Sequence, residues 1–424
     1  MFFAFYFCCI FVNADDLLQI YQQALKSDTI LLKAKADRDA MYDEIGVSRA
    51  RLLPQLSAQL GYNYAFDLAQ DYNKTSYGVA LTQSLYNYNN FVYLDIAHQY
   101  ASRAELSYQM TQQELILRTV RAYLNVLSSK DNLEYVIANQ KAIERQLEQT
   151  LQKYKVGLSP IIDVQEAQAK FDLSSAQAIS AENILQNSYE TLNVITGLEH
   201  KSLKKLNMDT FSPQMVSPSR FEQWKNIAES TNVVLLMGRL DVEIAKKNIQ
   251  LARSGYFPTL DAGLSYAGSH TNYKESNIPS VHIDGGDVGV TLRVPIFSGL
   301  SNYKSVQAKM NKKVSAQEQL EYIQRDLYSN IRSELNNIQA SLSSIKAYEQ
   351  SVISAKTALK AAETGFEVGT RTILDILEAT QSLYNAEKLL SDSRYQYINH
   401  VLNLKYIAGT INDEDLYLIN EYLI

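Results

Sequence analysis

The five histidines are the residues of this chain best suited to acid–base catalysis or metal binding, but they are scattered along it. Only His270 and His282 share one segment, which we expect to be a solvated loop, and no spaced carboxylates accompany them as in a metal site. The chain has no glycine-rich phosphate loop, no G-x-S-x-G and no H-E-x-x-H motif. We therefore predict that the protein is not an enzyme and uses no metal and no cofactor.

Both cysteines, Cys8 and Cys9, lie in the apolar stretch "MFFAFYFCCIFVNA" that begins the chain. This stretch is too short to cross a bilayer as a helix. It ends in "VNA", which is typical of a secretory cleavage site, so we interpret residues 1–14 as a signal peptide without the usual basic start. A buried N-terminal helix is the alternative. Cleavage would leave a chain without thiols, and therefore without disulfides or cysteine-bound metal.

The charge balance of the chain is mildly acidic. Its 424 residues carry a formal net charge of -6, and the sequence pI is about 5.6. A nucleic-acid-binding protein usually carries a basic stripe, so the composition argues against a nucleic-acid partner.

Two carboxylates with helical spacing, Asp375 and Glu378, stand in the stretch "FEVGTRTILDILEATQSLYNAEKLL", which begins at Phe366. Because they are three residues apart, they share one face of a helix. In a symmetric assembly they would form rings of negative charge, which attract cations and repel anions. Alternatively, they are solvated charges on an exposed helix. A similar stretch, "YKVGLSPIIDVQEAQAKFDLSSAQ", begins at Tyr154.

This similarity extends over most of the chain, which we interpret as two copies of one unit. Gly157 and Gly369, for example, lie 212 residues apart. The copies differ in length mainly between their first two strands, at about 67–76 and 269–287, where repeats usually carry loop insertions. After the signal peptide we expect a first repeat at 15–198, an equatorial linker at 199–232, a second repeat at 233–410 and a C-terminal equatorial segment at 411–424.

Four segments alternate between apolar residues and small or polar ones, at about 55–66, 77–86, 258–268 and 287–297. A period of two is typical of β-strands with two different faces. In the first segment, Leu56, Leu60 and Tyr62 would lie on one face, and Ser57 and Gln59 on the other. Each segment has about the length of a tilted membrane strand, and tyrosines cluster at the ends as in an aromatic girdle. The alternative is the edge of a soluble β-sandwich.

Long helices are expected after the second strand of each copy, because these stretches contain neither glycine nor proline. A helix of roughly 65 residues would be about 100 Å long. Its apolar residues recur at spacings of four and three, which is typical of a coiled-coil seam. We predict long helices at 88–155 and 300–365, and return helices at 161–196 and 373–408. Each pair would reverse at a tip, where Gly157 or Gly369 permits the turn.

The strand number has a consequence for assembly. Single-chain membrane barrels have at least about eight strands, so four cannot close one. An open strand edge is not tolerated in lipid, so several copies must share one barrel. We therefore predict a mixed α/β membrane protein. Four transmembrane β-strands per chain would contribute to the shared barrel, continued by a long antiparallel α-helical coiled-coil tunnel.

With these features the chain resembles the TolC-type family of outer-membrane efflux and secretion channels, over essentially its whole mature length. The matching stretches are "ARLLPQLSAQLGY", "VGLSPIIDVQEAQA", "PIFSG", "VGTRTILDILEATQSLYNAEKLL" and "LNLKYIAGTINDEDL". The resemblance implies a homotrimer, with a twelve-stranded barrel in the lipid of a Gram-negative outer membrane and a tunnel through the periplasm.

The resemblance also implies partners. The duct would passively conduct drugs, toxic compounds or secreted proteins from an inner-membrane pump of the RND, ABC or MFS type. A periplasmic adaptor (membrane fusion) protein would join pump and duct.

A gate at the tips is implied as well. By the resemblance, Asp163 and Arg371 link neighbouring coils, Asp375 forms the acidic ring at the constriction, and Glu378 holds the position of a second ring. Phe366 stands where the family has a tyrosine, so a phenolic hydrogen bond to Asp163 is not available.

The tips show one further departure from the family pattern and also carry the expected docking edge. Ile162 replaces a threonine of the family, so we expect the gate to depend more on packing and on Arg371. The adaptor-docking edge would consist of Val156, Gly157, Leu158, Val368, Gly369 and Thr370.

Two other functions are open alternatives. The first is an outer-membrane-anchored coiled-coil scaffold or adhesin without an open channel. Small polar strand residues such as Ser57, Asn63 and Thr82 favour a duct, because a solid barrel would place larger side chains inward. The second is a metal-efflux component, but methionine and histidine are not clustered along any helix, which argues against soft-metal selection.

Overall fold

The computed structural model describes residues 14–65, 71–207, 211–274 and 278–424. The chain divides into two compact units. Unit 1 contains the described residues up to Ala34, together with Gln109–Val233 and Arg325–Ile424; unit 2 contains Lys35–Tyr108 and Val234–Gln324. Apart from Ala14, the expected signal peptide lies outside the described residues.

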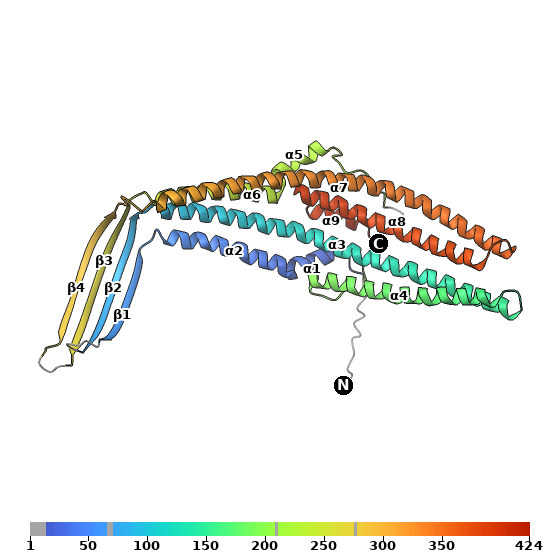
Figure 1. Ribbon diagram of the computed structural model, residues 1–424, viewed down its shortest axis with the longest axis horizontal. Coiled ribbons are helices and arrows are strands. Elements are labelled where there is room, and N and C mark those ends of the chain that lie inside the picture. The colour runs from blue at the N-terminus through green and yellow to red at the C-terminus, as the bar shows by residue number, and fades with distance from the viewer. Residues whose placement is uncertain (1–13, 66–70, 208–210, 275–277) are drawn as a thin grey trace, which may run out of the picture. The chain divides into compact units, whose positions relative to one another are not determined.

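Unit 2 contains one antiparallel sheet (Figure 1). Its strands are β1 (Gln55–Ala65), β2 (Tyr72–Tyr86), β3 (Thr259–Tyr273) and β4 (Val281–Arg293), and they lie in the order β1-β2-β3-β4. Each strand hydrogen-bonds only to its neighbours in this order. Among the described residues, the outer edges of β1 and β4 therefore have no strand partner.

The strands differ from the expected bounds. β2 begins at Tyr72 rather than at about 77, and β3 continues to Tyr273 rather than ending at about 268. Most of the described residues of the expected loops at 67–76 and 269–287 are therefore strand, and the prediction was wrong for them; residues 67–70 and 275–277 lie outside the described residues. The reason is that most residues in these stretches are polar. They give no apolar period of two, although the backbone still pairs with the neighbouring strands.

At its other end, β4 stops at Arg293, earlier than the expected 297. Pro295 follows, and a proline has no N–H to donate to the strand ladder. The apolar residues beyond Arg293 continue the alternation in the sequence without forming strand.

The two histidines of this hairpin also lie differently than expected. His270 is in β3 and His282 is in β4, and the register places them directly opposite each other. They are not residues of a solvated loop.

The helical part of unit 2 contains α6 (Val233–Ser254) except its first residue, which belongs to unit 1. It also contains parts of α2 (Thr29–Ala50), α3 (Tyr88–Lys155) and α7 (Ser301–Glu367). Ion pairs join α3 to α6: Arg103 Nε lies 2.6 Å from Asp241 Oδ1, and Lys247 Nζ lies 2.8 Å from Asp95 Oδ2. Such partly exposed pairs each contribute about 0–1 kcal/mol, so most of the stabilisation comes from the apolar residues between the helices.

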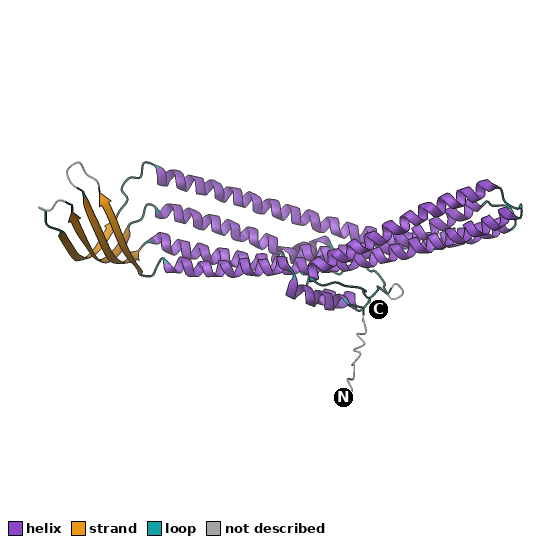
Figure 2. Cartoon of the chain, turned by 90° about the horizontal axis from the view of Figure 1, so that it is seen from below, coloured by secondary structure: helices purple, strands orange, loops and turns teal. Residues whose placement is uncertain are grey.

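Unit 1 contains two helical hairpins, shown as paired long helices in Figure 2. One consists of α3 and α4 (Ile161–Thr196), the other of α7 and α8 (Ile373–Ala408). These bounds lie within two residues of the expected ranges, because glycine and proline mark the helix ends clearly in the sequence.

An irregular layer with three short helices completes unit 1. These are α1 (Leu17–Ser27), α5 (Phe221–Thr231) and α9 (Asp413–Asn420). Isolated bridges pair Asp15 with Leu203 and Leu206 with Leu423, so the linker and the C-terminal segment lie together. The layer covers fully buried side chains, which include Leu17, Ile20, Leu115, Tyr123, Leu192, Leu404 and Leu416.

A buried ion pair fixes the start of α2 in this layer. Arg118 Nη1 and Nη2 each lie 2.9 Å from a carboxylate oxygen of Asp28. Burial alone would raise the pKa of Asp28, but Arg118 and the backbone N–H of Leu31 outweigh it and hold that pKa below its ordinary value. Because Asp28 is almost completely enclosed, losing Arg118 would leave a buried charge unpaired.

Candidate functional site

The two hairpin tips share one backbone motif. Gly157 has φ +77° and Gly369 has φ +80°, values that L side chains rarely adopt. At the first tip the N–H of Leu158 donates to the carbonyl of Lys153 at 2.8 Å; at the second, the N–H of Thr370 donates to Gly365 at 2.8 Å. These are Schellman turns, which end each long helix and reverse the chain.

Apolar side chains stand out from both tips. Val156 is 70% exposed, Leu158 is 78% exposed and Val368 is 70% exposed. The six predicted docking residues thus form two small edges, each built on a glycine turn, with apolar side chains facing solvent in the single chain.

The first turn of α8 holds the predicted acidic residue Asp375 in a capping box. Thr372 is the N-cap: its hydroxyl accepts from the N–H of Asp375, and the N–H of Thr372 donates to Asp375 Oδ2 at 2.7 Å. The backbone and hydroxyl of Thr372, followed by Arg371, hold the pKa of Asp375 below its ordinary value. The carboxylate is therefore charged at neutral pH.

The predicted link between Arg371 and Asp163 is not formed within this chain. Arg371, in the loop before α8, places Nη1 3.2 Å from Oδ1 of Asp375 in the first turn of that helix. Asp163 instead accepts a hydrogen bond of 2.6 Å from the hydroxyl of Ser159. Both aspartates lie near the start of a helix, so local partners reach them first. Asp163, Arg371 and Asp375, the residues predicted to form a gate, thus lie near the two tips and have local partners.

A hydrophobic cluster lies next to the tips and joins all four helices. Phe366, the departure noted in the sequence, packs against it from α7, and Lys153 Nζ lies 3.8 Å from the centre of its ring. A phenylalanine here therefore contributes apolar packing and a cation–π contact. The buried members are Ile143, Ala167, Ile373 and Leu377, with Leu147, Phe171 and Phe366 packed against them.

Glu378, three residues after Asp375 in α8, has different neighbours. It lines a polar groove of about 690 Å³ between α3, α4 and α8, together with Lys388. Asp375 is not among the lining residues. Most of the other lining side chains are amides and hydroxyls, among them Asn132, Asn139, Gln177, Gln381, Ser382 and Asn385. The two acidic residues share a helix but have separate surroundings.

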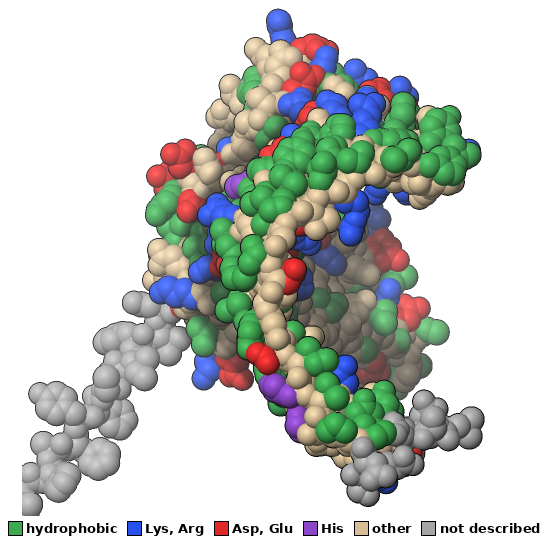
Figure 3. Space-filling view, turned by 90° about the vertical axis from the view of Figure 1, so that its left-hand side faces the viewer, with side chains coloured by type: hydrophobic (Ala, Val, Ile, Leu, Met, Phe, Trp, Pro, Cys, Tyr) green, Lys and Arg blue, Asp and Glu red, His purple; other side chains and the backbone are tan. Residues whose placement is uncertain are grey.

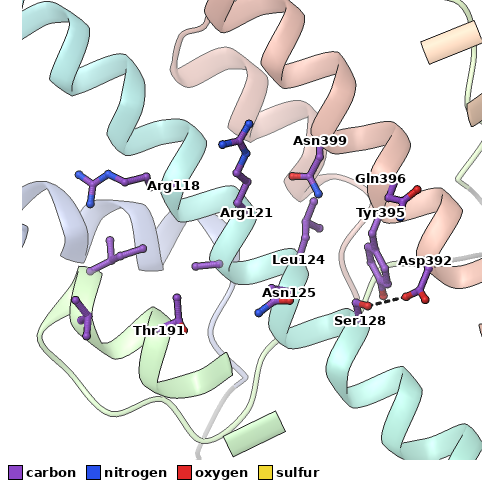
Figure 4. Close-up of a pocket in the computed structure, with 13 residues that line it drawn as sticks. Arg118, Arg121, Leu124, Asn125, Ser128, Thr191, Asp392, Tyr395, Gln396 and Asn399 are labelled. Atoms are coloured by element: carbon purple, nitrogen blue, oxygen red, sulfur yellow. Dashed lines mark hydrogen bonds between the residues drawn. The ribbon is translucent and has the colours of Figure 1, made fainter. Parts of the chain in front are cut away.

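A second depression, of about 860 Å³, lies between the same three helices (Figure 4). Arg118, Arg121 and Asn125 come from α3, and Asp392 and Asn399 from α8. The hydroxyl of Ser128 donates to Asp392 Oδ1 at 2.8 Å, as the dashed line in Figure 4 shows.

Sequence reasoning missed a polar network between α3 and α8. Asp131 Oδ2 accepts hydrogen bonds of 2.8 Å from the hydroxyls of both Ser391 and Tyr395. Burial raises the pKa of Asp131, and burial raises the pKa of the neighbouring Tyr135 to about 12. The spacing of Ser391 and Tyr395, one helical turn, was the only sequence signal, and it does not name the partner helix.

One face of the sheet is apolar and open to the surroundings. Figure 3 shows hydrophobic side chains gathered along the strands. Leu60 is 81% exposed and Val288 is 80% exposed. The cross-strand register places on this face Leu56, Leu60, Tyr77, Val79, Leu81, Leu264, Tyr266, Val288, Val290 and Leu292. Exposed apolar area of this extent marks a surface that meets lipid or another protein.

The opposite face carries small and polar residues. In the register, Ser57 lies across from Ala80, Ala80 from Ser265, and Ser265 from Asp287. The neighbouring row consists of Gln59, Gly78, Ala267 and Gly285. The predicted two-faced strands are therefore present.

Two further features bear on the class of protein. Across the described residues, no three His, Cys, Asp or Glu side chains stand in a geometry that would hold a metal ion. No helix in the described part of the chain has both the length and the hydropathy needed to cross a membrane.

Comparison with known families gives one clear match. The model of the family "Outer membrane efflux protein" matches residues 20–198 and again 224–410, which is most of the chain.

Curated relatives match over almost the full length. The outer membrane protein TolC of Vibrio cholerae is 41% identical over 413 residues, covering 96% of this chain and 94% of that protein. TolC of Escherichia coli is 40% identical over 432 residues, covering 97% and 85%. The proteases secretion protein PrtF of Dickeya chrysanthemi is 27% identical over 422 residues, covering 95% and 90%.

Solved structures share the fold at lower identity. CusC superposes with a TM-score of 0.78 at 15% identity, covering 94% of this chain and 93% of that one. The Campylobacter jejuni outer membrane channel CmeC superposes with a TM-score of 0.77 at 16% identity, covering 96% and 90%.

Proposed function

We propose, because this chain belongs to the outer membrane efflux protein family, that three copies assemble into one duct with a shared twelve-stranded barrel. The chain is an outer-membrane exit duct for efflux and type I secretion in a Gram-negative cell. As a transport protein of this class it is not an enzyme. The proposal concerns how the assembly of three copies, the gate at the tips and the partner proteins let cargo pass through the duct.

The two faces of the sheet carry the proposal. An apolar face that is open in the single chain is suited to the acyl chains of the outer membrane. The small polar residues on the other face would line a water-filled lumen. A scaffold or adhesin without a channel would have no use for this arrangement.

The open edges of β1 and β4 support the sharing of one barrel. In lipid, each unpaired backbone group costs several kcal/mol. Four strands are too few to close, so β4 of one copy would pair with β1 of the next. Three copies would give twelve strands and leave no edge.

The gate is proposed at the tips. Threefold symmetry would bring the Asp375 side chains into one ring and the Glu378 side chains into another, and both would favour cations. Arg371 is exposed in the single chain, where its partner is Asp375. In the trimer, Asp163 of a neighbouring copy would compete for Arg371, which would hold adjacent coils together at rest.

Partners are proposed to dock at the tip edges. The exposed apolar side chains of Val156, Leu158 and Val368 would meet a periplasmic adaptor, which joins the duct to an inner-membrane pump of the RND, ABC or MFS type. Two relatives, PrtF and the alkaline protease secretion protein AprF of Pseudomonas aeruginosa, are named for the secretion of proteases. This supports protein export beside drug efflux.

The internal repeat and the leader complete the proposal. The family model matches the chain in two stretches, 20–198 and 224–410, which supports repeats at 15–198 and 233–410. Residues 1–14 would direct export and be removed, leaving a duct that extends from the outer membrane into the periplasm.

Single-channel recording of the purified protein in a planar bilayer tests the proposal. We expect small cation-selective currents. Asp375→Ala combined with Glu378→Ala should reduce the cation preference, because the acidic rings are removed. Arg371→Ser should raise the resting conductance.

A matched control is Asp172→Ala with Glu182→Ala, which removes two carboxylates from exposed positions of α4 and should leave selectivity unchanged. Absence of current from an inserted trimer would favour the scaffold. Currents that none of the gate variants alters would disprove the position of the gate.

A further inference from the structure

The hairpin of β3 and β4 carries two histidines that face each other. His270 and His282 are directly opposite in the register, and their ring centres are 5.9 Å apart. They lie on the same face of the sheet as Tyr266 and the apolar side chains, beyond Tyr266 towards the end of the hairpin. Figure 3 shows histidine and acidic side chains next to each other on the sheet.

A carboxylate joins this pair. Asp284, two residues after His282 and therefore on the same face, places Oδ1 3.4 Å from His282 Nε2. The hydroxyl of Tyr266 donates to Asp284 Oδ2 at 2.7 Å. The carboxylate is thus oriented by a neighbouring strand, as the ligands of metal sites commonly are.

We propose that His270, His282 and Asp284 bind a divalent transition-metal ion such as Zn²⁺ on the outer face of this hairpin. Zinc takes nitrogen and oxygen ligands at about 2.0–2.2 Å, so two ligands of one tetrahedral ion are roughly 3.4 Å apart. The separation of His282 Nε2 and Asp284 Oδ1 has this value.

His270 must move to complete the site. Two imidazoles on one tetrahedral ion have ring centres ~5 Å apart, whereas those of His270 and His282 are 5.9 Å apart. As they stand, these three side chains are not in metal-binding geometry, and neither is any other group of three in the described residues. The ring centres must approach by about 1 Å, which requires a side-chain rotation; the imidazole of His282 is exposed and that of His270 is half-buried.

The ligand set identifies the class of ion. Imidazole nitrogen suits zinc, copper and nickel, whereas magnesium and calcium prefer oxygen ligands alone. Bound on adjacent strands, the ion would link β3 to β4. Gly285, Gly286 and Gly289 of β4 have no side chains to pack, and a glycine-rich strand specifies its register weakly. The metal would fix the register of this hairpin, a role independent of the proposed function.

Calorimetric titration of the full-length protein with ZnCl₂ tests the site. The protein is purified in detergent, its affinity tag is removed and it is treated with EDTA. We expect about one zinc per chain. His282→Ala and His270→Ala should each weaken binding by about tenfold or more. Asp284→Asn should weaken binding by a smaller factor. The matched control is His98→Ala, at an exposed position of α3, which should bind as the original protein does.

Cobalt provides a second readout that reports geometry. A tetrahedral Co²⁺ absorption band that is present in the original protein and in His98→Ala, and absent in His282→Ala, would support the site. Equal melting temperatures of all variants without metal would show that they fold. Zinc binding that is undiminished in His282→Ala, or no saturable binding at all, would overturn the proposal. Unchanged affinity in Asp284→Asn would overturn the three-ligand set.

Discussion

The two hairpin tips have the same backbone turn but different chemistry at the helix that follows. At the second tip, Thr372 caps α8 with its side chain and forms a capping box with Asp375. At the first tip, Pro160 is the N-cap of α4 and supplies no side-chain hydrogen bond. Asp163 turns back to Ser159 instead.

The two aspartates occupy equivalent positions. Asp163 and Asp375 are 212 residues apart, the same offset as Gly157 and Gly369, and each is the third residue of its helix. One carboxylate is held by a backbone N–H, a hydroxyl and a guanidinium, the other by a single hydroxyl in its own loop. The two tips therefore share the turn, while the start of α8 is held by more hydrogen bonds than the start of α4.

The largest expected effect comes from the cluster that both tips share. Leu377→Ala removes a side chain that is 3% exposed, and such truncations cost about 2–5 kcal/mol because they leave a cavity. Hydrogen exchange should therefore become faster at both tips, measured by mass spectrometry on peptides from all four helices. Ile179→Ala, at a site 71% exposed in α4, is the matched control and should have little effect. Exchange that rises at one tip only would show that the cluster does not couple them.

A smaller effect is expected from the cap that only one tip has. Thr372→Ala should lower the free energy of opening the first turn of α8 by about 1 kcal/mol. Pro160→Ala removes no side-chain hydrogen bond, so the start of α4 should change much less. The same exchange measurement compares the two helix starts. Equal changes at both would mean that the capping box contributes nothing beyond the turn itself.

The smallest effect is a pH dependence confined to the second tip. The pKa of Asp375 is lowered in the folded chain, so its stabilising contribution is complete above its ordinary pKa of about 4. It is lost as pH falls through the lower folded value. Hydrogen exchange at the start of α8, corrected for intrinsic rates, is compared between the original protein and Asp375→Asn. The difference in protection between them should be constant from pH 7 to about 5 and disappear in stronger acid. A difference that grows on acidification would contradict this sign.

The sequence was sufficient for the helices and the faces of the strands but not for the side-chain partners. Glycine at positive φ and proline near helix ends mark the hairpins, so their bounds could be predicted within two residues. Alternation of apolar residues identified the lipid-suited face. Where the alternation becomes polar, before Tyr77 in β2 and after Gly268 in β3, the strands extend without a hydropathic signal.

Pairings between distant residues had no signal of this kind. Asp131 meets Ser391 and Tyr395 across 260 and 264 residues, and the pair of His270 and His282 depends on a strand register. Arg371 was expected to link to Asp163 of a neighbouring coil, and within the chain it pairs with Asp375, four residues further on. Local competition of this type is visible only when side chains are placed in three dimensions.

The network around Asp131 also limits how the helices move. If α8 slid along α3 by one residue, a shift of about 1.5 Å, the hydroxyls of Ser391 and Tyr395 would leave a half-enclosed carboxylate. An unsatisfied group of that kind costs about 1–3 kcal/mol. Sliding of α8 along α3 is therefore expected to cost more free energy than bending or pivoting about this network. We therefore expect the tips to move by pivoting about Asp131 more readily than by sliding along the helix axis.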